Sequence, residues 1–431
     1  MLLQLNGNST SGMYDYTTDL TIINDDLLSD IVSLKQGEIG EAELSLNSSI
    51  FLAHERQHFI DLNYSYYGLN KIIKYFRFKA DFERDSTLLF VNPEFQTFIN
   101  DLKQRKKLVQ PIDDIGNPIL FIGLETQSNM SFSKNSSGIW HFEHINTIIY
   151  ERKAPEVEIA KMSLNEDSIL ELSALGAEYQ HKLSVYGNHI LDFEYEIFSL
   201  MHDFENSEYL SAFHIAHSSL RDGKYFDKPK SSNFPLTLSL LLGGLAARLA
   251  IAIVGTNSAK AINWHADFHR LCDLNNWKVE ELSQHCFSKL ECVFYNIILF
   301  AKETTSCMSF QEWTIDLLQL LGTNHLDLKS WIYDSTKHLI SQMDKLIECD
   351  ITKRRIQNSY NYLVRDFLST EIRVKEFNFP NPCDSISWMN IFWQSGAPPK
   401  LIYNSKYHES YLNYVSGSLN FQIYISNLLN S

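Results

Sequence analysis

The stretch IFLAHERQHFIDLNYSYYGL, residues 50–69, decides the fold class of this chain. Its centre is flanked by apolar residues and contains no proline, which is typical of an α-helix that packs into a hydrophobic core. Ser48 or Ser49 is a suitable N-cap for such a helix. We therefore expect a buried helix that begins there and runs past His58 towards Phe76.

The pentapeptide His54-Glu55-Arg56-Gln57-His58 within this stretch has the form H-E-x-x-H. On a helix the two histidines share one face, so both imidazoles can reach a single cation. Glu55 is placed to take a proton from a water that a metal has acidified. Asp61 is a candidate to hold the second ring nitrogen of His58, or a surface residue. The alternative is that the histidines are hydrogen-bonded core residues or part of a solvated strip.

A third ligand is needed, and the stretch DSILELSALGAEYQHKL, residues 167–183, is the best source. Glu171 is followed by small residues that allow a second helix to approach closely. Glu178 lies two turns further along the same face, and His181 is close by, so both are alternatives to Glu171. The acidic residues here could also form the solvated side of the helix.

Three other histidine pairs occur in the chain: His265 with His269, His141 with His144, and His214 with His217. We expect each pair to be structural. The pair His265 and His269 could also supply a ligand or form a second site.

The rest of the sequence predicts a mainly α protein with a small β-sheet element, an α+β arrangement with the H-E-x-x-H motif on a buried active-site helix. A β-favouring run covers residues 14–23, and the runs TLLFV, PILFIGLE, IWHFEHI and TIIYERKA follow between residues 87 and 160. A loop is expected at 127–138. We predict two regions: an N-terminal α+β region at 1–162 and a mainly helical region at 163–431 that completes the site.

The second region begins with Ser163-Leu164-Asn165-Glu166, which has the form of a capping box for a helix that runs to about Tyr186. Further helices are expected near residues 190–204, 235–254, 278–301, 309–321, 327–348 and 354–373.

The charge and the cysteine content of the chain limit which partners it can bind and in which cellular compartment we expect it. The chain has 431 residues and a formal charge of −15, so phosphate backbones would repel it and we expect no nucleic-acid partner. None of the six cysteines forms a C-x-x-C pair, and we read them as reduced, mostly buried thiols. Because the first residues lack a cationic start, we expect no secretory signal and a cytoplasmic location.

The apolar run FPLTLSLLLGGLAARLAIAIVG, residues 234–255, is long enough to cross a bilayer. Arg248 lies well inside it, and no strongly basic flank follows. We therefore expect a core helix and no stable membrane insertion. Arg248 would then need a carboxylate partner from the protein or from a ligand.

With His54, His58 and a later helical glutamate, the chain resembles the zincin metallopeptidases, most of all their gluzincin branch. The resemblance implies that His54, His58 and Glu171 bind Zn²⁺ and that Glu55 is the general base in cleavage of a peptide or protein amide bond. The extended metzincin motif is absent, because the residues that follow His58 do not fit it.

A second resemblance is to bacterial H-E-x-x-H proteins of peptide-modifying pathways that are iron-dependent oxygenases. Two histidines and a carboxylate suit Fe²⁺ as well as Zn²⁺. Arg248 could then bind the carboxylate of a cosubstrate. A third interpretation is a helical binding or scaffold protein whose metal site is structural or vestigial.

Overall fold

The protein is described from a computed structural model of the chain. The structure describes residues 12–17, 20–23, 25–107, 110–111, 124–134, 140–151, 157–186, 194, 196–197, 207–221, 236–275, 278, 280, 286–304, 310–343, 392–394, 400–402 and 408–430. The chain divides into two compact units, each described separately. Unit 1 consists of Met1–Gln104, Thr336–Glu371 and Asn378–Ser431, and unit 2 consists of Arg105–Ser335 and Ile372–Phe377. Residues 162 and 163, the expected boundary, both lie in unit 2.

Unit 1 combines helices from the start of the chain with a helix from its end. A four-stranded sheet in the order β1-β2-β7-β8 accompanies them, with β2 and β7 parallel and the other pairs antiparallel. The helices are α1 (Asp25–Gln36), η1 (Glu41–Glu43), α2 (Leu46–Asn63), α3 (Tyr66–Arg84), α4 (Thr87–Phe90), α5 (Pro93–Lys107, which ends in unit 2) and α17 (His408–Asn430). The strands are β1 (Gly12–Asp15), β2 (Leu20–Ile23), β7 (Phe392–Gln394) and β8 (Lys400–Ile402).

The helix that bears the H-E-x-x-H motif is shorter than predicted. Its N-cap is Ser45, whose hydroxyl accepts a hydrogen bond from the backbone N–H of Ser48, so the predicted caps at Ser48 and Ser49 are wrong. It ends at Asn63, and Ser65 caps the next helix by accepting the N–H of Gly68 at 2.9 Å. A Cβ on Gly68 would collide with the backbone of Leu62, so the turn requires glycine. The predicted continuous helix is therefore two helices, α2 and α3.

Contacts with β1 hold the second half of α2. The amide of Asn63 donates to the Tyr14 hydroxyl at 2.8 Å, and the Tyr14 ring packs edge-on against Phe59 at 5.5 Å between centroids. Most of the β-favouring run at 14–23 falls in β1 and β2, which pair antiparallel. The hairpin thus fixes the helix that presents the histidines.

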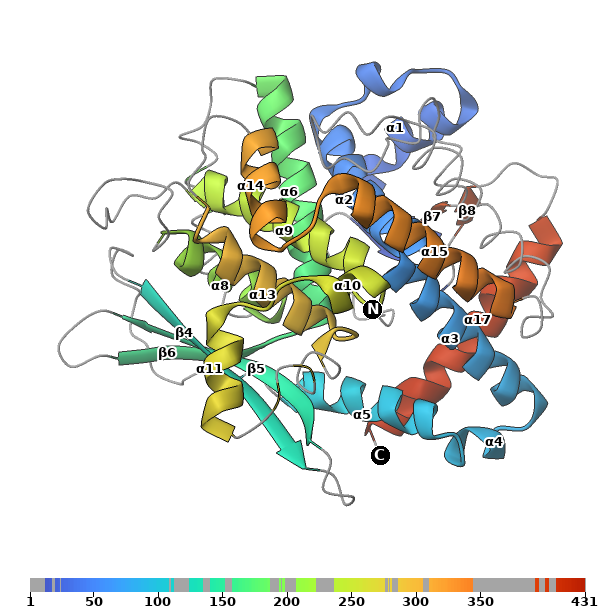
Figure 1. Cartoon of the computed structure of the whole chain (residues 1–431). Helices are drawn as coiled ribbons and strands as arrows, with labels where there is room; N and C mark the ends of the chain where they lie inside the picture. The colour runs from blue at the N-terminus through green and yellow to red at the C-terminus, as the bar shows by residue number, and fades with distance from the viewer. Residues whose placement is uncertain are drawn as a thin grey trace. The chain divides into compact units, whose positions relative to one another are not determined.

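The C-terminal helix α17 lies beside α3 (Figure 1), and an aromatic cluster joins the two helices. Phe421 of α17 is fully buried, and its ring lies 5.2 Å from that of Tyr75 and 5.4 Å from that of Phe82. The next residue, Gln422, donates to the buried carboxylate of Asp15 at 3.1 Å. Segments from the two ends of the chain therefore share one core in unit 1.

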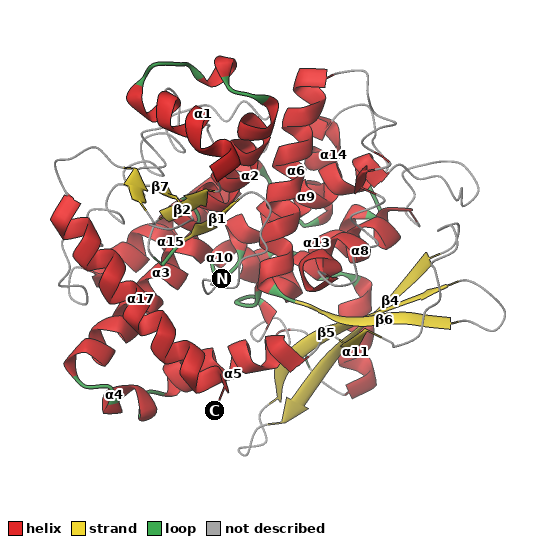
Figure 2. Cartoon of the chain, turned by 180° about the vertical axis from the view of Figure 1, so that it is seen from behind, coloured by secondary structure: helices red, strands yellow, loops and turns green. Residues whose placement is uncertain are grey.

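Unit 2 places a four-stranded antiparallel sheet beside a group of apolar helices (Figure 2). The strands, in the order β3-β6-β5-β4, are β3 (Gln110–Pro111), β4 (Leu124–Lys134), β5 (Trp140–Glu151) and β6 (Val157–Leu164). The helices are α6 (Glu166–Tyr186), α8 (Ser207–Arg221), α9 (Leu236–Ile253), α10 (Asn257–Ala261), α11 (Ala266–Asn275), α13 (Leu290–Ala301), α14 (Phe310–Leu320) and α15 (His325–Met343, which ends in unit 1).

The fold class is therefore as predicted: mainly α with small sheets. The helices predicted near 235–254, 309–321 and 327–348 correspond to α9, α14 and α15, and α13 forms the later part of the helix predicted at 278–301. The helix predicted at 354–373 and most of the one at 190–204 lie outside the described residues. Cys272, Cys286 and Cys292 are buried free thiols, as expected, and the other three cysteines also lie outside.

Two local predictions about strands and loops are wrong. The run TLLFV forms helix α4, because Asp85 accepts the N–H of Thr87 at 2.9 Å and starts a helical turn. Residues 127–134, predicted as part of a loop, belong to β4 and pair with β5, where Ser128 and Thr147 share a hydroxyl hydrogen bond of 3.2 Å. In both places the neighbouring structure outweighs the local preference of the residues.

Helix α6 begins at a different cap from the predicted one. The side chain of Asn165 accepts the N–H of Ser168 at 2.7 Å, whereas Ser163 lies in β6 and pairs with Asn146 of β5. The helix then runs to Tyr186, as predicted. A short strand-to-helix connection therefore sets where Glu171 lies along α6.

Helices α6 and α9 cross at two glycines. A Cβ built on Gly176 would come within 3.0 Å of the Gly244 Cα, and one built on Gly244 within 2.9 Å of the Gly176 Cα. The guanidinium of Arg248, which is only 2% exposed, donates to the carbonyl of Ser173 at 3.3 Å. That Arg248 also has a carboxylate partner stays a prediction.

Among the described helices, α9 alone is long and apolar enough to cross a membrane. Of its 18 residues, 78% are buried inside the protein. A residue far away in the sequence caps its N-terminus: the carboxylate of Glu194 accepts hydrogen bonds from the backbone N–H groups of Leu236 and Thr237 at 2.7 and 2.8 Å. A negative charge at this position also suits the helix dipole.

Replacing Gly244 with alanine should destabilise the fold, because the added methyl group meets the backbone of α6 and not a movable side chain. We expect a loss of about 1–3 kcal/mol in the free energy of unfolding, as for other overpacked sites. Urea denaturation measures it. Gly40→Ala is the control, since its Cβ would meet only a side-chain oxygen at 3.5 Å. Equal stabilities of the two variants would contradict the close crossing.

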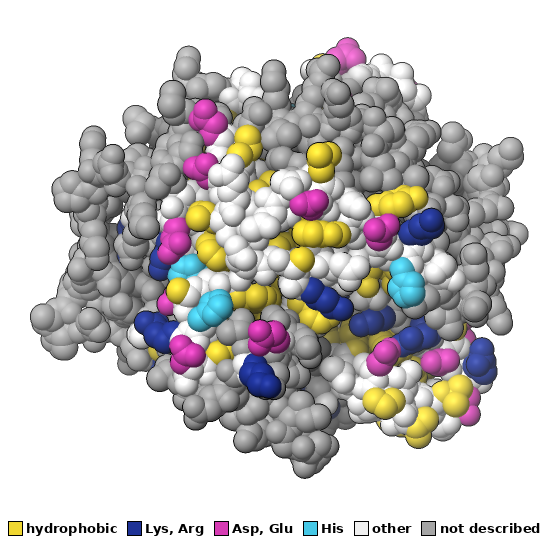
Figure 3. Space-filling model, in the orientation of Figure 1, with side chains coloured by type: hydrophobic (Ala, Val, Ile, Leu, Met, Phe, Trp, Pro, Cys, Tyr) yellow, Lys and Arg dark blue, Asp and Glu magenta, His cyan; other side chains and the backbone are white. Residues whose placement is uncertain are grey.

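Hydrophobic side chains gather over α4 on one face of the molecule (Figure 3). Leu88, Phe90 and Val91 are 37%, 56% and 77% exposed. The charged residues that precede the helix, Arg84 and Asp85, have opposite signs. The surface of unit 1 therefore carries a small apolar patch, with charged residues of both signs beside it (Figure 3).

Candidate metal centre

The two histidines of the motif lie one turn apart on α2, with their ring centroids 4.9 Å from each other and their planes at 76°. Both side chains are partly exposed. This follows directly from helix geometry, because residues four positions apart share a face. The rings are close enough to bind one ion together.

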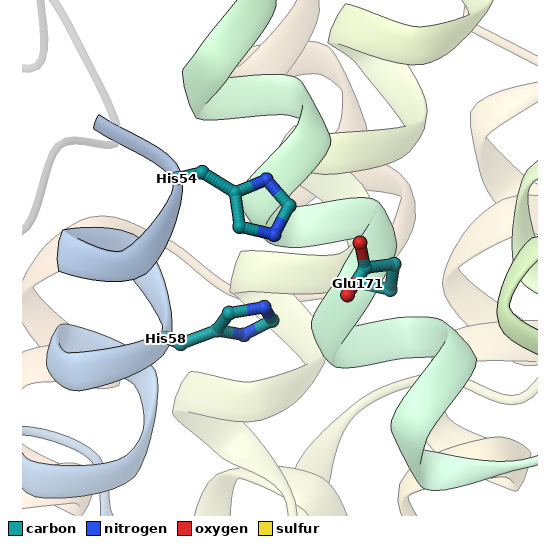
Figure 4. Close-up of side chains that lie close together, drawn as sticks. All are labelled: His54, His58 and Glu171. Atoms are coloured by element: carbon teal, nitrogen blue, oxygen red, sulfur yellow. The ribbon is translucent and has the colours of Figure 1, made fainter. Parts of the chain in front are cut away.

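The structure places Glu171 of α6 next to this pair (Figure 4). His54, His58 and Glu171 each offer one ligand atom, and these three atoms lie within 4.8 Å of one another. Within the described part of the chain, this is the group of three such residues that could hold a metal ion. Of the third ligands considered from sequence, Glu171 is the one brought to the histidines.

The donor set and its geometry suit a tetrahedral metal site. Ligation at about 2.0–2.2 Å puts neighbouring ligand atoms roughly 3.4 Å apart. In the structure the three ligand atoms lie within 4.8 Å of one another, so a bound ion would draw them closer together. With three protein ligands, such a site keeps a fourth position for water or substrate.

Glu55 lies next to His54 on α2 and is only 4% exposed. Its Oε2 atom is fully shielded from solvent. Glu55 is not one of the three grouped ligand residues. A carboxylate beside these possible ligands, and separate from them, could act as a proton acceptor.

Beside the histidines, α2 carries a buried polar pair, Gln57 and Asp61, of which only Asp61 stood out in the sequence. The side-chain amide of Gln57 donates to Oδ1 of Asp61 at 2.7 Å, and these residues are 8% and 1% exposed. The signal was present in the sequence, because Gln and Asp stand four positions apart. Asp61 is therefore buried, and the surface alternative for this residue is wrong.

Glu178, the first alternative third ligand, is engaged elsewhere. Its carboxylate lies 2.8 Å from the buried ammonium of Lys182, which is also 2.6 Å from Glu196. Burial on its own lowers the pKa of Lys182, but the two carboxylates outweigh it and raise the pKa above its ordinary value. The other alternative, His181, is partly exposed and, like Glu178, does not belong to the group of possible ligands.

Histidines of the other two pairs whose side chains the structure describes make structural contacts. His265 stands at the N-terminus of α11, where its Nδ1 accepts the N–H of Asp267 at 3.2 Å and its Nε2 faces Glu303 at 3.1 Å. His269 contacts the carbonyl of Trp264 at 3.1 Å.

The pair on α8 is partly explained in the same way, because Nδ1 of His217 lies 2.8 Å from the Ser239 hydroxyl on α9. The side chains of His141 and His144 lie outside the described residues. In the described part of the chain, neither His214 with His217 nor His265 with His269 belongs to a group of three possible metal ligands.

Comparison of the chain with models of known protein families, with curated proteins and with solved structures returned no match.

Proposed function

We propose that the protein is a zinc-dependent hydrolase that cleaves a peptide or protein amide bond. The observation that carries the proposal is the convergence of His54, His58 and Glu171, with Glu55 buried beside the first ligand. Two histidines and a glutamate are a ligand set found in catalytic zinc sites. The resemblance of this pattern to the gluzincin peptidases supports the same function.

In this proposal the residues of the chain divide the work. His54, His58 and Glu171 hold Zn²⁺, which when bound polarises the substrate carbonyl and acidifies a water molecule. Glu55 takes the proton from that water and passes it to the leaving amine.

A second candidate function is an iron-dependent oxygenase that modifies a peptide or an amino acid. The same observation supports it, because two histidines and one carboxylate are also the ligands of non-haem Fe²⁺ enzymes. The buried carboxylate of Glu55 favours the hydrolase, since an oxygenase needs no general base at that position.

The experiment is to purify the full chain without added metal and measure its metal content and its hydrolysis of a peptide mixture. We expect about one equivalent of zinc per chain, and hydrolysis that a chelator abolishes and added Zn²⁺ restores. Iron at one equivalent, with oxygen uptake in place of hydrolysis, would support the oxygenase instead. Bound zinc with no turnover of any peptide would support a structural site.

A further inference from the structure

The C-terminal helix is bonded to the start of the chain through one buried side chain. The amide of Gln422 in α17 donates to the carboxylate of Asp15 at 3.1 Å and also to the hydroxyl of Thr17. All three side chains are buried. The last helix of the chain therefore contacts the end of β1 inside the core of unit 1.

These hydrogen bonds compensate a buried acidic group. Burying a carboxylate is costly unless hydrogen bonds or charges offset the loss of water. Thr17 donates to Asp15 through its backbone N–H at 3.0 Å and through its hydroxyl at 2.8 Å, and Gln422 adds a donor from the other end of the chain. Removing the amide of Gln422 should therefore loosen Asp15 and the strand to which it belongs.

The residue next to Asp15 holds the helix that bears the histidines. The Tyr14 hydroxyl accepts the side-chain amide of Asn63 at 2.8 Å. The Tyr14 ring packs against Phe59, which directly follows His58 in α2. A continuous series of buried contacts therefore runs from α17 through β1 to the turn of α2 beside a proposed ligand.

Metal affinity depends on how firmly such a helix is held before the ion arrives. Ligand side chains must be kept close to their productive positions by the structure around them. The apparent dissociation constant rises by the inverse of the fraction of molecules in which they are so placed. Contacts that fix α2 therefore strengthen metal binding without touching the ion.

We propose that Gln422 and Tyr14 form a latch that couples docking of the C-terminal helix to metal binding by His54 and His58. Both are positioning residues, because they act through α2 and contact neither metal nor substrate. The inference rests on the proposed metal site. Because coupling between two sites is reciprocal, bound zinc should in turn hold α17 more firmly.

Hydrogen exchange and zinc affinity of the full chain test the latch. Gln422→Met removes the donor but keeps a side chain of similar size. It should speed exchange of the α2 amides in the zinc-free protein and weaken zinc binding by roughly 2–10-fold, as loss of a coupled contact does. Tyr14→Phe should act in the same direction, and the double variant should lose little more affinity than either single variant, because both changes break one series of contacts.

The reciprocal effect has a measurement of its own. In the wild type, Zn²⁺ should slow exchange of the backbone amides at 408–430. In Tyr14→Phe saturated with zinc, this protection should be lost, whereas a general stabilisation by a bound ion would persist.

The matched control is Phe78→Leu. Phe78 is buried on α3 and packs against Phe95 and Phe98 of α5, away from the series of contacts that forms the latch. This variant should lower the free energy of unfolding, keep the zinc affinity of the wild type and retain the protection of 408–430 by zinc.

The outcomes separate this inference from the proposed function. Zinc bound by the wild type, but held equally well by Gln422→Met and Tyr14→Phe, would overturn only the latch. The same holds if zinc still protects 408–430 fully in Tyr14→Phe. If Gln422→Met does not fold, Tyr14→Phe decides. A wild-type chain that binds no zinc would overturn both proposals.

Discussion

Glu55→Gln is expected to leave about one equivalent of metal bound and to reduce peptide hydrolysis by roughly 10²–10⁴-fold, the usual contribution of a general base. The amide has nearly the shape of the carboxylate but cannot accept the proton of the attacking water. Because Glu55 lies outside the group of three ligand residues, its replacement should not release the ion. Metal content and the hydrolysis rate, both measured on the same preparation, give the result.

The control for this experiment is Glu83→Gln, an equivalent change at an exposed site on α3 where the carboxylate pairs with Lys79. It should change neither metal content nor rate. Loss of metal from Glu55→Gln would identify Glu55 as a ligand. A full rate with metal retained would mean that another group takes the proton.

The second large effect concerns the third ligand. Glu171→Ala should release the metal, as His58→Ala should, because the two remaining ligands no longer converge on a complete site. The loss of affinity should exceed the roughly 10–100-fold that removal of an outer partner causes. Metal content after dialysis, followed by titration with Zn²⁺, measures it.

Glu178→Ala is the matched control, because it removes the same side chain from the same face of α6, two turns away. Its carboxylate pairs with Lys182 and should not be needed for metal binding. Equal metal content in wild type, Glu171→Ala and His58→Ala would show that the residues grouped in the structure do not bind an ion. Loss of metal from Glu178→Ala alone would identify Glu178 as the ligand.

The parts of the fold and site that could be predicted from sequence depend on local spacing. Helix geometry alone makes His54 and His58 neighbours, and the apolar residues around them predict a buried helix. The crossing of α6 and α9 also has a local signal, since the small residues Ser173, Ala174, Gly176 and Ala177 indicate that another helix packs closely, and Gly176 meets Gly244 of α9.

The parts that could not be predicted depend on partners distant in the sequence. Glu171 and Glu178 share a face of α6, and only the ion pair with Lys182 and Glu196 distinguishes them. The polar residues of β4 read as a loop because pairing with β5 is not visible in their own sequence. The end of α2 was missed for a local reason: Ser65 was not recognised as the cap of a new helix.

The discontinuous make-up of unit 1 has a consequence for how the protein is synthesised. A ribosome produces the histidine-bearing helix α2 early, but Phe421 and Gln422, which complete its unit, emerge only after the whole of Arg105–Ser335. Unit 2 is nearly contiguous and can fold first, which reverses the common order in which N-terminal domains fold before later ones. Until α17 is synthesised, Tyr75 and Phe82 of α3 lack their ring contacts with Phe421, so this part of the core of unit 1 forms last.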